Sequence, residues 1–305
     1  MINQVKAYKV DAFVKNNSGG SPTGVVLNAT GLTGDQMQFI TNQLGVSHTA
    51  FVFEPTTSAG NVAVRFFTAG GEILNCGHGT IAAHYTRARH FNFPDHHVFY
   101  QQAKEGIQQI EVVYEDQQLN IFLKQNKIHF LPTGIEEEKY LLEALNIKGT
   151  DLDPDFPIII ASPGSNRLLL SLNSPELLNS IAPDFDRLKR VCDQVKSIGC
   201  FIYCIRSVQS KPEAIARMFA PNIGVNEDII NGNSSGCLGA YLLRLNGETN
   251  VELLVNQGHT LNCEGVVKVN AKKMDDHFET MIGGSAKIKT EILLSLPGNF
   301  HRADL

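Results

Sequence analysis

The sequence predicts an α+β protein built from two similar domains. Short strand patterns are frequent and helical patterns are few, and the two do not alternate regularly as they would in a doubly wound parallel sheet. A pattern that begins near Arg65 in the first half returns near Arg217 in the second half. The length of 305 residues, set against roughly 150 residues for a typical domain, also indicates two domains.

Strand patterns run along the whole chain, starting with the N-terminal residues 1–14. In residues 61–67 the apolar side chains of Val62, Val64 and Phe66 alternate with their neighbours, as on a half-buried strand. The remaining predicted strands are short segments rich in β-branched or aromatic residues and bounded by turn residues. They are residues 110–114, 119–124, 156–161, 167–172, 201–206, 251–255 and 266–269.

Three segments have helical periodicity: residues 33–45, 135–147 and 183–195. The first begins with Thr33 as its N-cap and ends at Gly45, and the other two have acidic first turns, all of which are helix-terminus signals.

A different, more buried helix is expected after the stretch "NCGHGT", because the following "IAAHYTRA" is rich in small and apolar residues. Its first turn is predicted at Gly79–Thr80. The second half repeats the arrangement, with "NGNSSG" ahead of "CLGAYLL".

The internal repeat relates "VRFFTAGGEILNCGHGTIAAHYTR" (64–87) to "ARMFAPNIGVNEDIINGNSSGCLGAYLLR" (216–244). Both copies open with an arginine, an apolar residue and a phenylalanine. Both then pass an acidic residue and a glycine-rich polar cluster, and close on an apolar helix that carries a tyrosine. Two copies imply a pair of pseudo-twofold-related domains, not a solenoid.

Proline, glycine and acidic residues concentrate in residues 128–156, so the domain boundary is placed there. The predicted domains are residues 1–127 and residues 128–284. The C-terminal segment 285–305 is expected to return to the first domain.

Composition excludes several classes of protein. The net charge of −5 argues against binding to nucleic acid or an acidic membrane surface, which requires a basic face. No positively charged segment precedes an apolar run at the N-terminus, and no 18 consecutive residues are apolar, so neither a signal peptide nor a membrane-spanning helix is expected. We therefore expect a cytoplasmic protein whose six cysteines are free thiols.

No cofactor is predicted. Cys192, Cys200 and Cys204 match no zinc-ligand spacing and fall in an amphipathic helix and an apolar strand, which is typical of core thiols. The phosphate-binding loop and the dinucleotide-binding glycine pattern are both absent. No HExxH pair or second pair of metal ligands occurs at suitable spacing, so no metal ion is expected.

The starts of the two buried helices are candidate anion sites. The first N–H groups of a helix have no internal acceptor, and the helix dipole adds partial positive charge there. Such an end binds carboxylates or phosphates. We expect residues 76–80 and 231–235 to face one cleft and to bind a small anionic substrate.

Cys76 and His78 leave several interpretations open. Cys76 could be a buried spectator thiol, or a nucleophile or base activated by the helix N-terminus. His78 could be a structural histidine, or could contact a ligand brought close by its flanking glycines. In the second copy of the repeat, Asn231 stands at the place equivalent to Cys76, and Cys237 is expected in the core.

Several stretches together resemble the phenazine-biosynthesis PhzF-like family of the diaminopimelate-epimerase-like superfamily. They are "YKVDAFV", "GGSPTGVVL", "VSHTAFVF", "RFFTAGGEILNCGHGTIAAH", "NEDIINGNSSGCLGAYLL" and "VNQG". The resemblance covers nearly the whole chain. It implies two domains, each a β-barrel-like sheet around a central helix, with an interdomain active site, cofactor-independent proton transfer at carbon and commonly a homodimer.

The resemblance also implies site residues. The family's acid/base glutamate, in a Ser-Glu-Thr motif, is replaced here by His48 in Ser47-His48-Thr49. His78 matches the histidine of the Cys-Gly-His motif, and Asp228 matches the substrate-contacting acidic residue. Substrate-binding positions are carried over to both glycine-rich segments and to the N-terminal motif Gly20-Ser21-Pro22. They are Ser21, Cys76, Gly77, Gly79, Thr80, Gly232, Asn233 and Ser234.

The predicted function is a cofactor-independent isomerase-type enzyme that moves a proton at a carbon of a small carboxylated metabolite. His48 is the expected acid/base, since imidazole, with an ordinary pKa of about 6.5, accepts and returns protons near neutrality. Ser47 and Thr49 offer hydroxyls that could fix its tautomer. The alternatives are a lyase or dehydratase on a similar substrate, and a non-catalytic small-molecule-binding homologue. A homodimer without nucleic-acid or membrane partners is expected.

Overall fold

The computed structural model describes residues 2–58, 60–115, 117–207 and 211–297. Contacts within the chain divide it into unit 1, residues 1–124 with 283–305, and unit 2, residues 125–282. The boundaries predicted from the sequence, after residues 127 and 284, lie a few residues further along the chain. The predicted return of the C-terminal segment concerns strand β18 (Ala286–Ser295), which belongs to unit 1, while residues 298–305 lie outside the described residues.

Unit 1 contains two helices and, with β18, nine strands among its described residues. The elements before β18 are β1 (Gln4–Ala12), β2 (Ser21–Val26), α1 (Gly34–Leu44), β3 (His48–Phe53), β4 (Val62–Thr68), β5 (Gly71–Ile73), α2 (Gly77–Phe91), β6 (His96–Ala103), β7 (Gly106–Glu115) and β8 (Gln118–Lys124).

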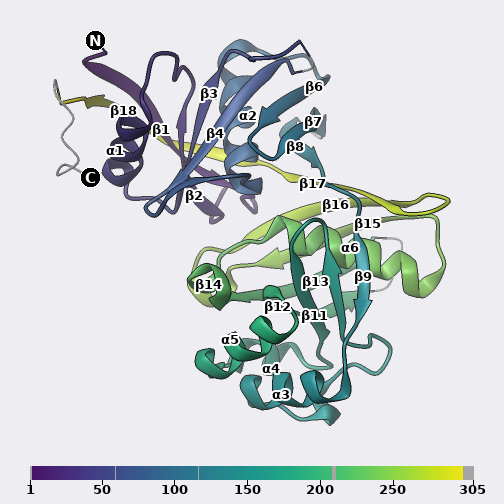
Figure 1. Cartoon of the computed structure of the whole chain (residues 1–305). Helices are drawn as coiled ribbons and strands as arrows, with labels where there is room; N and C mark the ends of the chain where they lie inside the picture. The colour runs from purple at the N-terminus through teal and green to yellow at the C-terminus, as the bar shows by residue number, and fades with distance from the viewer. Residues whose placement is uncertain (1, 59, 116, 208–210, 298–305) are drawn as a thin grey trace. The chain divides into compact units, whose positions relative to one another are not determined.

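The strands of unit 1 form a mixed sheet that surrounds α2. Strand β1 pairs antiparallel with β18 and β2, β2 pairs parallel with β3, and β3 pairs antiparallel with β4. Strand β4 pairs antiparallel with the short β5 and parallel with β6, and β6, β7 and β8 follow as antiparallel neighbours. Helix α2 contacts strands from both ends of this order, β1, β2 and β18 as well as β7 and β8 (Figure 1).

Unit 2 repeats this content and adds small helices. Its elements are β9 (His129–Pro132), α3 (Ile135–Leu145), η1 (Gly149–Asp151), β10 (Ile159–Ser162), β11 (Asn166–Ser171), α4 (Pro175–Ser180), α5 (Phe185–Gln194), β12 (Ser197–Ser207), β13 (Glu213–Ala220), η2 (Pro221–Ile223), β14 (Val225–Asp228), α6 (Gly232–Asn246), β15 (Asn250–Gln257), η3 (His259–Leu261), β16 (Gly265–Lys273) and β17 (Phe278–Gly284).

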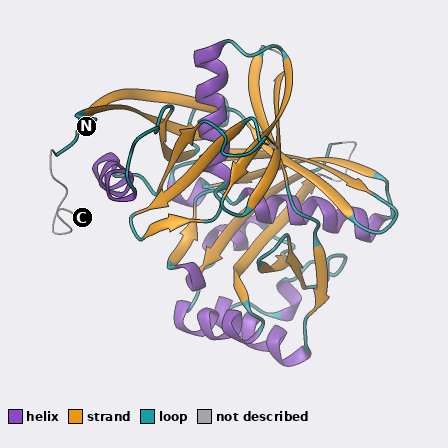
Figure 2. Ribbon diagram, turned by 45° about the horizontal axis from the view of Figure 1, so that its top comes forward, coloured by secondary structure: helices purple, strands orange, loops and turns teal. Residues whose placement is uncertain are grey.

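The order of strand pairing in unit 2 matches that in unit 1. Strand β10 pairs antiparallel with β11, β11 parallel with β12, and β12 antiparallel with β13. Strand β13 pairs antiparallel with the short β14 and parallel with β15, which pairs antiparallel with β16. Helix α6 packs on β11, β15 and β16, and Figure 2 shows this helix among the strands of its unit. The predicted internal repeat is therefore confirmed at the level of topology.

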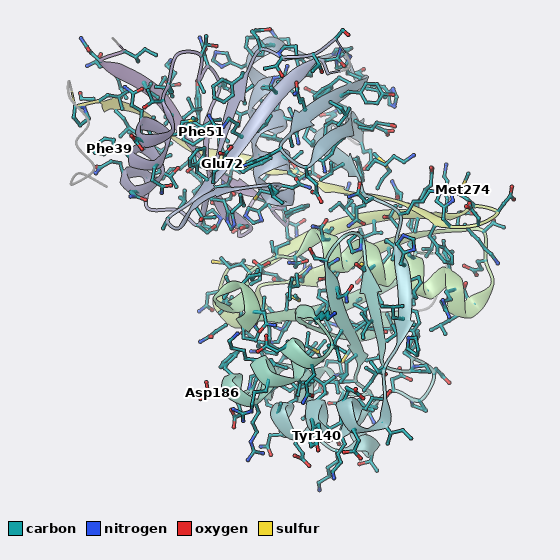
Figure 3. All side chains as sticks on the ribbon, viewed as in Figure 1. Phe39, Phe51, Glu72, Tyr140, Asp186 and Met274 are labelled. Atoms are coloured by element: carbon teal, nitrogen blue, oxygen red, sulfur yellow. The ribbon has the colours of Figure 1, made fainter. Side chains whose placement is uncertain are left out.

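The helices predicted from periodicity pack on the sheets, α1 on β3 and β4 and α5 on β12. Helix α1 has Thr33 as its N-cap in a full capping box with Gln36, and it ends at Gly45 in the left-handed conformation. Its apolar face packs with Phe51, and Phe39 lies partly buried beside this cluster (Figure 3). In unit 2, α3 packs on α5; Tyr140 and Asp186 mark these two helices in Figure 3.

Both buried helices begin earlier than the sequence suggested. Helix α2 starts at Gly77 with Cys76 as its N-cap, and α6 starts at Gly232 with Asn231 as its N-cap. The prediction placed these residues in loops because glycine and polar residues are typical of loops. Gly79 is needed for packing, since a Cβ there would lie 2.9 Å from the Phe66 ring. No helix within the described residues is long and apolar enough to cross a membrane.

Candidate active site

The N-terminus of α2 forms the centre of the candidate site in unit 1. The N-cap Cys76 accepts a hydrogen bond from the Gly79 N–H through its Sγ at 3.3 Å, and its carbonyl oxygen accepts one from the Thr80 N–H at 2.9 Å. The N–H groups of Gly77 and His78 are left without an acceptor inside the helix. A Cβ built on Gly77 would meet nothing within 4 Å, so the start of the helix is open at this residue.

His48 and His78 form a direct contact. His48 is the first residue of β3, and its Nδ1 lies 2.8 Å from Nε2 of His78, with the two rings close to perpendicular at 79°. The two hydroxyls predicted to orient His48 do not bond to its ring. Ser47 Oγ donates to the Pro22 carbonyl oxygen, and Thr49 Oγ1 is buried without a hydrogen-bond partner. The suggestion that these hydroxyls fix the tautomer is wrong, because the second histidine contacts the ring instead.

The electrostatics of this pair differ from those of an exposed imidazole. Burial lowers the pKa of His78 to about 4, because a charged ring loses its hydration there. His78 is therefore neutral at physiological pH, with one ring nitrogen available as an acceptor. A single proton lies between His48 Nδ1 and His78 Nε2 when both rings are neutral.

The thiol of Cys76 lies beside the two rings. The Cys76 Sγ and one ring nitrogen each of His48 and His78 lie within 4.8 Å of one another, and these are groups that could hold a metal ion. Cys76 is buried, with 5% of its surface exposed, whereas both histidines are partly exposed. Unit 1 thus brings together three of the residues singled out from the sequence, two of them from α2 and one from β3.

The other predicted residues of unit 1 lie nearby in the fold but face its interior. Ser21 is buried at the start of β2, two residues before Thr23, which pairs with His48 across the parallel strands. Thr80 is fully buried, and its Oγ1 accepts a hydrogen bond from Gln101 Nε2. Its N–H is already bonded to the Cys76 carbonyl oxygen and its hydroxyl is buried, so Thr80 exposes neither group to a substrate.

A buried polar network that the sequence did not reveal lies behind Thr80. Gln101 Nε2 donates to Thr80 Oγ1 and Gln108 Oε1, and its Oε1 lies 2.7 Å from His84 Nε2. Arg87 Nη1 lies 3.2 Å from the other ring nitrogen of His84. Since arginine can only donate, His84 carries its proton on Nε2 and donates to Gln101. Burial lowers the pKa of His84 to about 3, so this ring stays neutral.

Unit 2 builds a related site from amides and one carboxylate. Asn231 Oδ1 accepts from the Ser234 N–H at 2.9 Å, and its Nδ2 donates to Asp228 Oδ2 at 2.9 Å. The N–H groups of Gly232 and Asn233 have no acceptor inside α6. Asp228, Gly232 and Asn233 are thus brought together, while Ser234 is fully buried, with its hydroxyl against Met218 Sδ.

The remaining cysteines of interest belong to the core, as predicted. Cys192, Cys200 and Cys204 are buried. Cys237 is fully buried within α6, and its Sγ accepts a hydrogen bond from Arg167 Nη1. Burial raises the pKa of the Cys237 thiol, which makes it a poor proton acceptor.

Comparison with known proteins decides the family. Residues 10–291 match the family described as phenazine biosynthesis-like protein. The chain belongs to this family. It is 36% identical over 304 residues to an uncharacterized isomerase of Clostridium acetobutylicum, covering 97% of this chain and all of that protein. It is 29% identical to the trans-2,3-dihydro-3-hydroxyanthranilate isomerase of Pseudomonas fluorescens, covering 77% of this chain and 78% of that enzyme.

Solved structures show the same fold. The Bacillus anthracis phenazine biosynthesis protein of the PhzF family superposes with a TM-score of 0.86 at 25% identity, covering 97% of this chain and 100% of that one. A hydroxyproline epimerase from Agrobacterium vitis superposes with a TM-score of 0.62 at 9% identity, covering 96% and 93% of the two chains, and this likeness concerns the fold alone. The predicted epimerase-like α+β fold and the PhzF-like, isomerase-type enzyme class are confirmed.

Proposed function

We propose that this protein is an isomerase that moves a proton between carbon positions of a small carboxylated metabolite, with His48 as the acid/base. The proposal depends chiefly on the contact of 2.8 Å between His48 Nδ1 and His78 Nε2. A base held by a second group in this way is the arrangement that acid/base catalysis requires. It is further supported by the isomerase names of the relatives.

In this mechanism His48 carries its proton on Nδ1, and this N–H donates a hydrogen bond to Nε2 of the neutral His78. The lone pair of His48 Nε2 then takes a proton from a carbon of the substrate, and the imidazolium so formed keeps its hydrogen bond to His78. The electron pair of the broken C–H bond moves into the adjacent unsaturated part of the substrate. His48 then returns the proton to a different carbon of the substrate. These steps require neither a metal ion nor a nucleotide.

The anionic substrate is bound by the first turn of α2. The N–H groups of Gly77 and His78 donate to its carboxylate, at a helix end where negative charge is favoured. Because charge also develops on the substrate as the proton leaves, amides fixed in the helix would stabilise the transition state. Gly77 leaves room for this approach since it has no side chain.

Residues of unit 2 enter the proposal through the family resemblance. Asp228 is held by Asn231, and the amides of Gly232 and Asn233 have no acceptor inside α6. We assign them to substrate binding and not to proton transfer. That the two helix starts serve one substrate stays a prediction, as do the homodimer and the cytoplasmic location.

The test is hydrogen exchange at carbon. Purified protein is incubated with a panel of small unsaturated or 2-substituted carboxylates in D₂O, and deuterium incorporation and products are followed by NMR. We expect one class of carboxylate to gain deuterium at carbon, and the His48→Ala variant to lose at least about 100-fold in rate. The exposed His90 offers a matched control, because His90→Ala removes an imidazole from the same unit away from the site.

The outcomes separate the alternatives. A product that has lost a leaving group would make the protein a lyase or dehydratase. Binding without exchange or product would make it a non-catalytic homologue. Full turnover in His48→Ala together with loss in Cys76→Ser would transfer the proton-moving role to the thiol.

A further inference from the structure

The three groups at the start of α2 have a second chemical capacity. Two imidazole nitrogens and one thiol sulfur lie within 4.8 Å of one another. In a tetrahedral zinc site the bonds are about 2.0–2.3 Å, so neighbouring ligand atoms lie roughly 3.5 Å apart. The cluster of His48, Cys76 and His78 is therefore within small side-chain movements of a three-ligand site.

The chemistry of each group suits a borderline metal. Imidazole binds metal through the lone pair of its neutral form, and His48 and His78 each bring one ring nitrogen to the cluster. A sulfur ligand carries negative charge when it binds metal, and Cys76 stands at a helix N-terminus, where the dipole favours such charge. The Gly79 N–H already donates to this sulfur at 3.3 Å, which is the kind of second contact that orients a ligand.

The three possible ligands could not be recognised from their spacing in the sequence. Cys76 and His78 are two residues apart, and the third ligand comes from β3, 30 residues upstream. The expectation that no metal would bind was drawn from ligand pairs along the chain. It did not include a residue that β3 places beside α2.

We propose that His48, Cys76 and His78 form a His₂Cys site for a transition metal such as Zn²⁺, with a fourth position open to water or a carboxylate oxygen. The metal takes the place of the proton that the two rings share, and His48 Nδ1 and His78 Nε2 each give it a lone pair. The proton between the rings moves to the outer nitrogen of its ring, and the thiol releases one proton to solvent. Net binding is thus one metal ion in and one proton out.

Metal binding and proton transfer compete for the ring of His48. If the proposed function is correct, a Zn²⁺ ion bound at His48 Nδ1 leaves the ring proton on Nε2, the nitrogen that acts as the base, and therefore inhibits turnover reversibly. This consequence rests on the proposed function, whereas the metal site itself does not.

The test begins with protein stripped by EDTA and titrated with Co²⁺, followed by displacement with Zn²⁺. We expect one ion per chain, the intense visible absorption of tetrahedral Co²⁺ and a sulfur-to-cobalt charge-transfer band in the near ultraviolet. Changes in partners that only orient a ligand weaken metal binding about 10–100-fold, so removing a ligand should cost more than about 100-fold. This loss is expected for His48→Ala, Cys76→Ser and His78→Ala, with Cys76→Ser also lacking the charge-transfer band.

Control variants and activity separate the possible outcomes. Cys263→Ser and His90→Ala, which change a thiol and an imidazole elsewhere, should bind the ion as the wild type does, and circular dichroism verifies that every variant is folded. Absence of Co²⁺ binding, or binding unaffected by Cys76→Ser and His78→Ala, would overturn the site. Tight binding without inhibition of turnover would keep the site and refute the assignment of His48 as the base.

Discussion

The two units use one scaffold for different chemistry. Each presents a 15-residue helix whose N-cap side chain accepts a hydrogen bond from the third helical residue, Cys76 in α2 and Asn231 in α6. In unit 1 the groups around this start are two histidines and a thiol, which are side chains able to gain and lose protons. In unit 2 they are amides and the carboxylate of Asp228. The duplicated helix start is common to both units, and the proposal that it binds an anion applies to both. Among the described residues, the paired imidazoles of His48 and His78 lie beside the start of α2.

The hairpin that precedes each helix shows a second difference. Arg65 forms a two-point ion pair with Glu72, and Arg217 forms one with Glu227, each across the turn between neighbouring strands. The Arg65 side chain is 39% exposed and that of Arg217 is 8% exposed. Arg217 also donates to carbonyl oxygens at the end of α4, so the second pair joins the hairpin to a helix.

The largest predicted difference between the units is in the stability lost when the ion pair is broken, and it follows from the burial of Arg217. Glu227→Gln leaves a buried guanidinium without its counter-charge, which costs about 3–5 kcal/mol of unfolding free energy. Glu72→Gln breaks a partly exposed pair and should cost about 1 kcal/mol or less. Urea unfolding followed by circular dichroism compares the two. Equal losses would contradict the comparison. Arg217→Met combined with Glu227→Leu should recover part of the loss, because both charges are gone although the carbonyl oxygens of Leu178 and Ile181 lose their donor.

The kinetic roles assigned to the two helix starts should also separate. His78→Ala removes the group that orients His48, and we expect kcat to fall about 10–100-fold, the usual effect of losing an orienting partner, with little change in KM. Asp228→Asn should instead raise KM, because it alters substrate binding without touching the base. Steady-state kinetics on the substrate found by deuterium exchange measures both. A kcat loss confined to Asp228→Asn would reverse the assignment.

Acid should lower the stability of unit 1 through His84, which has no histidine at the equivalent position of unit 2. His84 lies eight residues after the N-cap of α2; the equivalent residue of α6 is Gly239, where a Cβ would lie 2.7 Å from Val269. The pKa of His84 is about 3 in the folded protein against about 6.5 in the unfolded chain. The unfolded chain therefore binds more protons between these values, and stability falls as the pH drops below 6.5.

The size of this effect is about 2 kcal/mol lost at pH 5, obtained from 1.36 kcal/mol per pKa unit. His84→Gln keeps an N–H donor for Gln101 but does not titrate, so its unfolding free energy should vary less between pH 7 and pH 5. His90→Gln, at an exposed position of the same helix, is the matched control for the loss of an imidazole. Identical pH slopes in wild type and His84→Gln would show that the ring is protonated in the fold.

Local signals predicted much of the fold, since helix caps, alternation and the repeat are all encoded by neighbouring residues. Thr33 and Gly45 bound α1 as predicted. The starts of α2 and α6 were missed because a cysteine is a rare N-cap and glycine is usually a helix breaker. The contact of His48 with His78 could not be predicted from either residue, because it depends on how β3 pairs in the sheet and where α2 packs on it.

The smallest predicted effect concerns the two N-caps themselves. Asparagine is among the best N-cap residues, and replacing such a cap by alanine typically costs about 1 kcal/mol. A thiol is a weak acceptor, and Cys76 accepts at 3.3 Å where Asn231 accepts at 2.9 Å. Asn231→Ala should therefore destabilise the protein by about 1 kcal/mol, and Cys76→Ala by less.

The reverse substitution tests why the weaker cap is present. If Cys76 is there for its chemistry, Cys76→Asn should raise the unfolding midpoint slightly, because it installs the cap that α6 already uses, while the bound Co²⁺ loses its sulfur charge-transfer band. Urea unfolding and the Co²⁺ spectrum are measured on the same protein sample. A fall in stability would mean that the thiol packs better than the amide against Gly79 and Phe66, whose ring approaches this turn closely. A gain in stability with loss of metal binding would show that Cys76 supplies a metal-binding sulfur at the cost of a weaker helix cap.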